Sequence, residues 1–135
     1  MSKVVLDTNC LIQSVPRHSK HHAVWESFEK GVNTLCVSNE IIDEYVEIMQ
    51  ILFGYEAAEY TVKTILNSPF VELVTPFYHF ELIKTDPDDN KFVDCAIAAS
   101  AKYIVSNDHH YNILKAIPFP KVIVLSIDEF QESIY

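Results

Sequence analysis

Short apolar runs alternate with longer amphipathic stretches along the chain. The short runs are rich in β-branched residues, as strands are, and the longer stretches repeat apolar residues at helical spacing. The pattern predicts five strands, at residues 4–6, 34–38, 71–74, 103–106 and 121–126. It also predicts helices at residues 18–30, 39–53, 55–67 and 86–102, with a last helical turn or two in "IDEFQESI" (127–134).

This alternation predicts a single α/β domain over residues 1–135, with a parallel sheet and helices on both of its faces. The length suffices for one core, and with only two glycines and no low-complexity run we expect no linker and no repeat. Ligands of such sheets bind outside the carboxyl ends of the strands, near the point where the strand order reverses. Polar residues that follow a strand are therefore the first candidates for a site.

The net charge of −9 comes from 19 acidic and 10 basic residues. It argues against a general nucleic-acid binder, because such proteins usually present a basic surface. Two interpretations stay open. The acids form a solubilising surface, or some of them converge on cations, which can present positive charge to a phosphate.

Three cysteines, Cys10, Cys36 and Cys95, lie far apart in apolar surroundings. We expect them to be reduced core thiols of a cytoplasmic protein. The sequence has no Cys-x-x-Cys pair, the spacing that would indicate a zinc site. No stretch approaches the roughly 20 apolar residues of a membrane span. Asp7 interrupts the apolar start, which argues against a signal peptide.

Two predicted strands end in a carboxylate, in "VVLDTN" (4–9) and in "YIVSND" (103–108). Parallel strands would bring Asp7 and Asp108 to the same edge of the sheet. The alternative is that each Asp only caps the turn or helix that follows it.

Glu44 lies at the side of the apolar stripe expected on helix 39–53. That stripe consists of Ile41, Tyr45, Ile48, Met49 and Leu52. A partly buried carboxylate is costly unless it is paired or binds a metal. The alternative is a surface Glu at the rim of the core.

The segment "TDPDDNKFVDCAIAAS" (85–100) holds four acids. Asp86 before Pro87 is a strong helix start, and Asp88 and Asp89 then favour the helix dipole, which alone would explain them. Asp94 interrupts an otherwise apolar run. Because Asp89 and Asp94 are about 140° apart on a helix, we do not expect both to serve one metal equally.

The six histidines show no ligand spacing, and solvated side chains are the default interpretation; His109 or His110, beside Asp108, is a candidate for contact with a phosphate. No glycine-rich phosphate loop is present.

Taken together, "VVLDTN", Glu44, "DPDDNKFVDCAIAASA" and "YIVSND" resemble the pattern of the PIN-domain family, in the same order over nearly the whole chain. The resemblance is greatest to compact prokaryotic PIN proteins labelled as toxins of toxin–antitoxin pairs. It implies a three-layer α/β/α fold with a central parallel sheet of about five strands. It further implies an endoribonuclease that depends on one or two Mg²⁺ or Mn²⁺ ions.

The resemblance also implies roles for individual residues. The first, second and last family acids correspond to Asp7, Glu44 and Asp108. Asp89 fits the third acid best, and Asp94 is the alternative or an added outer acid. The supporting polar residues correspond to Asn9 and Ser106.

These acids and their ions would direct water at RNA phosphodiesters, leaving a 5′-phosphate and a 3′-hydroxyl. An antitoxin protein is an expected partner and a homodimer is a further one. The strongly acidic balance departs from many relatives and puts free-standing RNA affinity in question. The aromatic residues of segment 55–83 are expected mostly in the core, with a dimer face or an antitoxin groove as the alternative.

Three alternatives to this assignment are open. A haloacid-dehalogenase-like phosphatase would need an Asp where Asn9 stands, and a receiver domain would need adjacent acids after the first strand. The third alternative is a catalytically weak PIN-fold module that binds RNA or a protein.

Overall fold

A computed structural model describes residues 2–84, 86–118 and 120–135. Its sheet contains β1 (Lys3–Leu6), β2 (Thr34–Val37), β3 (Val71–Leu73), β4 (Tyr103–Val105) and β5 (Ile123–Leu125). The strands are all parallel and lie in the order β3-β2-β1-β4-β5. The prediction of a five-stranded parallel sheet is therefore confirmed.

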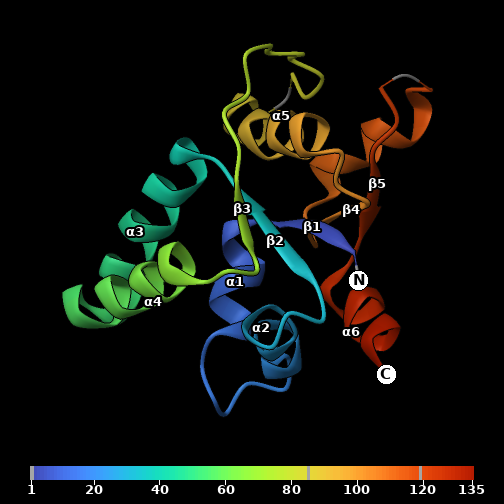
Figure 1. Cartoon of the computed structure of the whole chain (residues 1–135). Helices are drawn as coiled ribbons and strands as arrows, with labels where there is room; N and C mark the ends of the chain where they lie inside the picture. Colours follow the sequence, from blue (N-terminus) through green and yellow to red (C-terminus); the bar gives the residue numbers. More distant parts are fainter. Residues whose placement is uncertain (1, 85, 119) are drawn as a thin grey trace.

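Helices cover both faces of the sheet, as the three-layer prediction requires (Figure 1). One side carries α5 (Asn90–Ala99), which packs against β1, β2 and β4. The other side carries α1 (Thr8–Ser14), α2 (His22–Glu29) and α6 (Ile127–Ile134), with α2 against both α1 and α6. The hairpin of α3 (Asn39–Phe53) and α4 (Tyr55–Asn67) extends beside β3.

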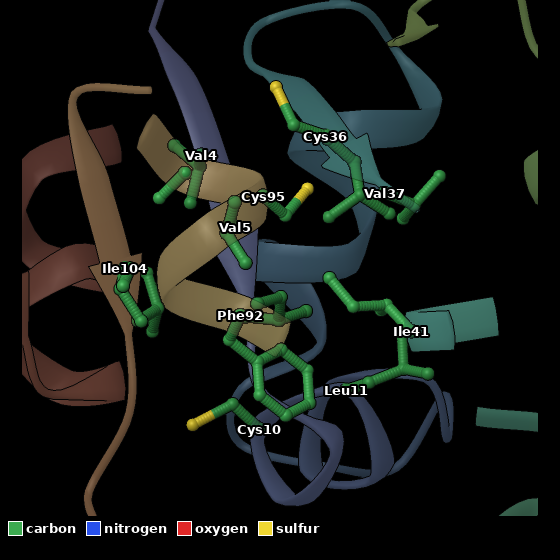
Figure 2. Close-up of a cluster of buried hydrophobic side chains, with 14 of the residues drawn as sticks. Val4, Val5, Cys10, Leu11, Cys36, Val37, Ile41, Phe92, Cys95 and Ile104 are labelled. Carbon is green, nitrogen blue, oxygen red and sulfur yellow. The ribbon is translucent and has the colours of Figure 1, made fainter. Parts of the chain in front are cut away.

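The core lies between these layers, and Figure 2 shows side chains from β1, β2, β4 and the adjoining helices meeting there. Val4, Val5 and Leu6 are all fully buried, which is expected of a central parallel strand covered on both faces. The three cysteines are buried and free, so the prediction of reduced core thiols is confirmed.

The order of the strands reverses between β1 and β4. From β1 the chain builds outward to β2 and β3, then crosses back to place β4 on the other side of β1. Leu6 of β1 is in register with Val105 of β4, and the backbone N–H of Asp7 donates to the Val105 carbonyl at 3.1 Å. The residues that follow these two strands therefore emerge side by side at the position where parallel sheets bind ligands.

Two helical segments were not predicted from the sequence. The first is α1, which begins directly after Asp7, and the second is the 3₁₀ helix η2 (His109–Ala116) after Asp108. The helix predicted from His18 begins only at His22. A 3₁₀ turn, η1 (Pro87–Asp89), precedes α5, and Asp86 makes no side-chain capping bond there.

Two burial predictions are wrong. Leu52, placed in the buried stripe of α3, is 56% exposed, because the last turn of α3 projects beyond the core. Most aromatic residues of segment 55–83 are exposed rather than buried, namely Tyr55, Tyr60, Phe70, Phe77 and Tyr78. Within the described ranges, no helix is long and apolar enough to cross a membrane.

Candidate metal centre

Asp7 is held rigidly at the end of β1. Its side chain is the N-cap of α1, where Oδ1 accepts a hydrogen bond from the Cys10 backbone N–H at 2.8 Å. Its Oδ2 accepts a hydrogen bond from the Ser106 hydroxyl. Burial raises the pKa of Asp7, and these two hydrogen bonds oppose that shift. The Asp7 carboxylate can therefore cap α1 and still form part of a site at the end of β1.

Asp108 is tied to Asp7 through Ser106. The Ser106 Oγ that donates to Asp7 also accepts from the Asp108 backbone N–H at 3.0 Å. The Asp108 carboxylate then caps η2 by accepting from the His110 backbone N–H at 2.9 Å. This short network fixes the two acids that follow β1 and β4 relative to each other.

Asp86 and Asp89 reach the same place from the turn that precedes α5. One ligand atom from each of Asp86, Asp89, Asp108 and His110 lies within 4.8 Å of all the others. The His110 imidazole lies among the three carboxylates, with its Nδ1 3.2 Å from Asp108 Oδ1, 3.6 Å from Asp89 Oδ2 and 3.7 Å from Asp86 Oδ2. Two segments, 86–89 and 108–110, thus converge on one point, and Asp7 adjoins it through Ser106.

Negative charge accumulates at this point. The pKa of Asp89 is raised to about 6 by burial and by the neighbouring carboxylates of Asp86 and Asp108, with a smaller contribution from Asp7. His110 opposes the shift only in part. Asp7 and Asp108 are also coupled, since the Asp108 charge contributes to the raised pKa of Asp7. Such repulsion favours the binding of a cation.

Three buried polar atoms at this point lack a hydrogen-bond partner among the described residues: Asp89 Oδ2, His110 Nδ1 and Tyr111 Oη. Tyr111 is fully buried, and burial followed by the Asp89 charge raises its pKa. Buried polar groups are normally paired, so the Tyr111 hydroxyl needs an explanation, whereas His110 Nδ1 and Asp89 Oδ2 lie within ion-pair distance of each other. Carboxylate and imidazole ligands with free lone pairs fit a divalent cation.

Glu44 lies outside this four-residue group and is occupied by other partners. Its Oε2 accepts from the Thr8 hydroxyl, and its Oε1 forms an ion pair with Lys91 Nζ at 2.8 Å. The side chains of Lys91 and Glu44 are 13% and 26% exposed. Thr8 directly follows Asp7, so Glu44 adjoins the acids but is neutralised by a lysine.

Asp94 faces a different part of the molecule. Its buried carboxylate accepts from the Phe80 backbone N–H and pairs with His79 Nδ1, both at 3.1 Å. The hydrogen bond and the charge of Asp94 raise the pKa of His79. Asp94 therefore anchors the segment before η1, and of the two candidates for the third acid the structure brings only Asp89 to Asp108.

The two supporting residues lie in different environments. Ser106 is buried and links Asp7 to Asp108, as described above. Asn9 is exposed on the first turn of α1, where it lines an open cavity of about 400 Å³ together with Asp7 and Asp108. The cavity gives solvent and a ligand access to Asp7 and Asp108.

Sequence reasoning missed the parts played by Asp86, Thr8, Lys91 and Tyr111, and it left His110 as a phosphate contact only. The Asp86-Pro87 pair predicts only a helix cap, because Asp-Pro is a common helix start. Only the spacing of His110, two residues after an acid at a strand end, could have indicated its place. The other partners lie on segments whose approach no local pattern specifies.

Comparisons with known proteins identify the family of the chain. The family model described as a PIN domain matches residues 3–110. No curated protein sequence matches the chain.

Three solved structures resemble the fold. VapBC2 from Rickettsia felis, bound to a DNA fragment from its promoter, superposes with a TM-score of 0.64 at 20% identity, covering 92% of this chain and 98% of that one. DNA-bound VapBC from Salmonella typhimurium gives 0.58 at 14% identity, with 94% and 99% covered. The PIN domain endonuclease Utp24 gives 0.52 at 16% identity, with 92% and 84% covered.

Proposed function

Because the chain belongs to the PIN-domain family, we propose that it is a metal-dependent endoribonuclease. The reaction is hydrolysis of RNA phosphodiester bonds, leaving a 5′-phosphate and a 3′-hydroxyl. The observation that carries the proposal is the convergence of Asp7, Asp89 and Asp108 at the carboxyl edge of the sheet, where burial and the charges of the neighbouring acids raise the pKa of Asp89 to about 6.

The surroundings of each acid indicate a different role for it. Asp89 and Asp108 belong to the four-residue group that would hold Mg²⁺ or Mn²⁺, whereas Asp7 is fixed by Cys10 and Ser106 and sets the shape of the site. A divalent cation bound there would supply an activated water and would neutralise charge on the phosphate. Asn9, on the open cavity, is placed to contact the substrate.

The thiol nearest to the acids does not compete with water as the nucleophile of the reaction. Cys10 is the thiol beside Asp7, but it is fully buried, and burial together with the Asp7 charge raises its pKa. A thiol in that state is not reactive. Attack by water is therefore the route that the site favours.

Glu44 is the second acid in the proposal. Through Thr8 it borders Asp7, and Lys91 holds its carboxylate in place. Its role is to orient solvent or an ion at the rim of the site when the Lys91 contact is displaced by substrate.

A toxin role is the second part of the proposal. Two of the similar structures are VapBC assemblies. An antitoxin protein would need an apolar surface, and the end of the α3–α4 hairpin offers Ile51, Leu52 and Tyr55, which are 71%, 56% and 66% exposed. A homodimer through the same residues is the alternative, and the expected compartment is the cytoplasm.

A catalytically weak module that binds RNA or a protein is the competing function. The net charge of −9 favours it, because an acidic surface suits a basic protein partner better than RNA. The pairing of Glu44 with Lys91 favours it as well, since that acid is already neutralised.

The deciding experiment is cleavage of single-stranded RNA in Mn²⁺ by the purified wild type and by three variants. Asp7→Asn and Asp108→Asn should each lower the rate by at least a hundredfold. Asp88→Asn is the matched control, because Asp88 lies in the same acidic turn but outside the four-residue group, and it should cleave like the wild type. Equal rates for all four proteins would exclude the nuclease and leave the binding module.

A further inference from the structure

We propose that His110 is a nitrogen ligand of the bound cation, in a mixed site completed by Asp86, Asp89 and Asp108, and that this imidazole makes the site select first-row transition metals over Mg²⁺. The inference deepens the proposed function, since it concerns the same cation. It does not need the chain to cleave RNA.

The spacing of the ligand atoms supports a cation of this size. Octahedral ligands at 2.0–2.1 Å from a small divalent ion are about 3 Å apart when adjacent and about 4 Å apart when opposite. The His110 Nδ1 lies 3.2, 3.6 and 3.7 Å from its three carboxylate oxygens, and all four ligand atoms lie within 4.8 Å of one another. A modest contraction would place every one of them on a shared ion.

The unpaired buried atoms are an independent indication that a ligand belongs here. Tyr111, which is fully buried, has a hydroxyl without a hydrogen-bond partner among the described residues, and its coupling to the Asp89 charge places it beside the group. Asp89 Oδ2 and His110 Nδ1 form no hydrogen bond either, although they lie 3.6 Å apart, within ion-pair distance of each other. A cation would satisfy the carboxylate and the imidazole, and its water ligands would satisfy the hydroxyl.

His110 is held in position before any ion arrives. Its backbone N–H is fixed by the Asp108 cap at the start of η2, and its ring contacts the His109 ring with centroids 4.8 Å apart. Its side chain is 33% exposed, whereas that of His109 is 85% exposed, and His109 Nδ1 is 4.0 Å from Asp108. Of the two adjacent histidines, His110 is the one that lies near three carboxylates, whereas His109 lies near Asp108 alone.

The preference for a transition metal follows from ligand chemistry. Mg²⁺ takes oxygen ligands and keeps its waters, whereas imidazole nitrogen suits the first-row transition metals. A site of four carboxylates would not discriminate in this way. Replacement of the imidazole should therefore weaken binding of Mn²⁺ much more than binding of Mg²⁺.

The test uses Mn²⁺ as the probe, on the full chain and without RNA. Pulsed electron paramagnetic resonance of the Mn²⁺ complex reports a directly bound nitrogen through its ¹⁴N modulation. We expect this modulation in the wild type and in His109→Ala, the matched control, and its loss in His110→Ala. Calorimetric titration should show Mn²⁺ affinity falling about tenfold or more in His110→Ala, while Mg²⁺ affinity changes less than threefold.

Absence of ¹⁴N modulation in the wild type, its persistence in His110→Ala, or equal losses of Mn²⁺ and Mg²⁺ affinity would each overturn the inference. Asp86→Asn is a second variant of the same site that keeps His110. It should lower the affinity for both Mn²⁺ and Mg²⁺ and retain the ¹⁴N modulation. A protein that binds Mn²⁺ through nitrogen but leaves RNA intact would refute the proposed function alone.

Discussion

The Ser106 hydroxyl donates a hydrogen bond to the Asp7 carboxylate and so joins the ends of β1 and β4, 99 residues apart, side chain to side chain. Its oxygen also accepts from the Asp108 backbone N–H. One small buried residue thus sets the relative positions of two acids of the site.

Ser106→Ala removes both of these contacts. Because the buried Asp7 oxygen loses its donor, we expect the free energy of unfolding to fall by about 1–3 kcal/mol, and cation affinity to fall as Asp108 loses its fixed position. Denaturant unfolding and Mn²⁺ titration measure the two effects. Ser133→Ala, which removes only a hydrogen bond from an exposed residue to the Phe130 carbonyl of its own helix, should change both quantities little.

Stability should depend on pH through Asp89. Its pKa is raised from 3.8 to about 6 in the folded state, so between these values the folded chain binds more protons than the unfolded chain. The stability of the metal-free protein therefore falls as pH rises from about 4 to 6, and the loss is complete above the folded-state pKa. Burial also raises the pKa of Asp7, so Asp7 contributes to the same fall in stability with rising pH.

Unfolding measured at pH 5 and at pH 7.5 tests this dependence. The wild type should lose more stability between the two than Asp89→Asn does, and Mn²⁺ should restore the loss at pH 7.5. An identical pH profile in the variant would show that Asp89 is not the group responsible.

Lys91→Met removes the cation that neutralises Glu44. Leaving this partly buried carboxylate without its charged partner should cost about 1–3 kcal/mol. The same change should tighten Mn²⁺ binding, because one more negative charge faces the site. Lys63→Met breaks the exposed Glu59–Lys63 pair on α4 and serves as the control, with little effect on either quantity. Unchanged Mn²⁺ affinity in Lys91→Met would mean that Glu44 is remote from the cation.

The choice between Asp89 and Asp94 has a direct test. Asp94→Ala leaves the Phe80 N–H without its acceptor, so we expect a loss of about 1–3 kcal/mol in stability and no change in Mn²⁺ affinity. Asp89→Asn should do the reverse, with weaker Mn²⁺ binding and a protein at least as stable. Calorimetric Mn²⁺ titration of the two variants tests this choice. Weaker Mn²⁺ binding in Asp94→Ala, with unchanged binding in Asp89→Asn, would mean that Asp94 is the third acid of the site.

Much of the fold was predictable, because strands, helices and polar residues at strand ends obey local rules. Asp7 and Asp108 each follow an apolar strand, and this pattern predicts the edge of the sheet at which they meet, because the carboxyl ends of parallel strands lie at the same edge. The helix α1 escaped prediction because it spans only seven residues and starts with polar side chains. Its N-cap is the same Asp7 that belongs to the site.

The details of the site depend on contacts between distant segments, which no local pattern contains. Asp86 has the sequence context of a cap but not its hydrogen bond, because its carboxylate turns toward His110. Glu44 was recognised as partly buried, yet its partners, Thr8 and Lys91, lie 36 and 47 positions away. Leu52 followed the helical periodicity but lies beyond the core.

A crystal of the wild-type protein grown with Mn²⁺ and measured at the manganese absorption edge tests the account most directly. We predict one strong anomalous peak among Asp86, Asp89, Asp108 and His110, on the Asp7 side of the carboxyl edge of the sheet. A protein saturated with Mn²⁺ whose peak lies elsewhere, or that shows no peak, would contradict the claim that these acids form a cation site.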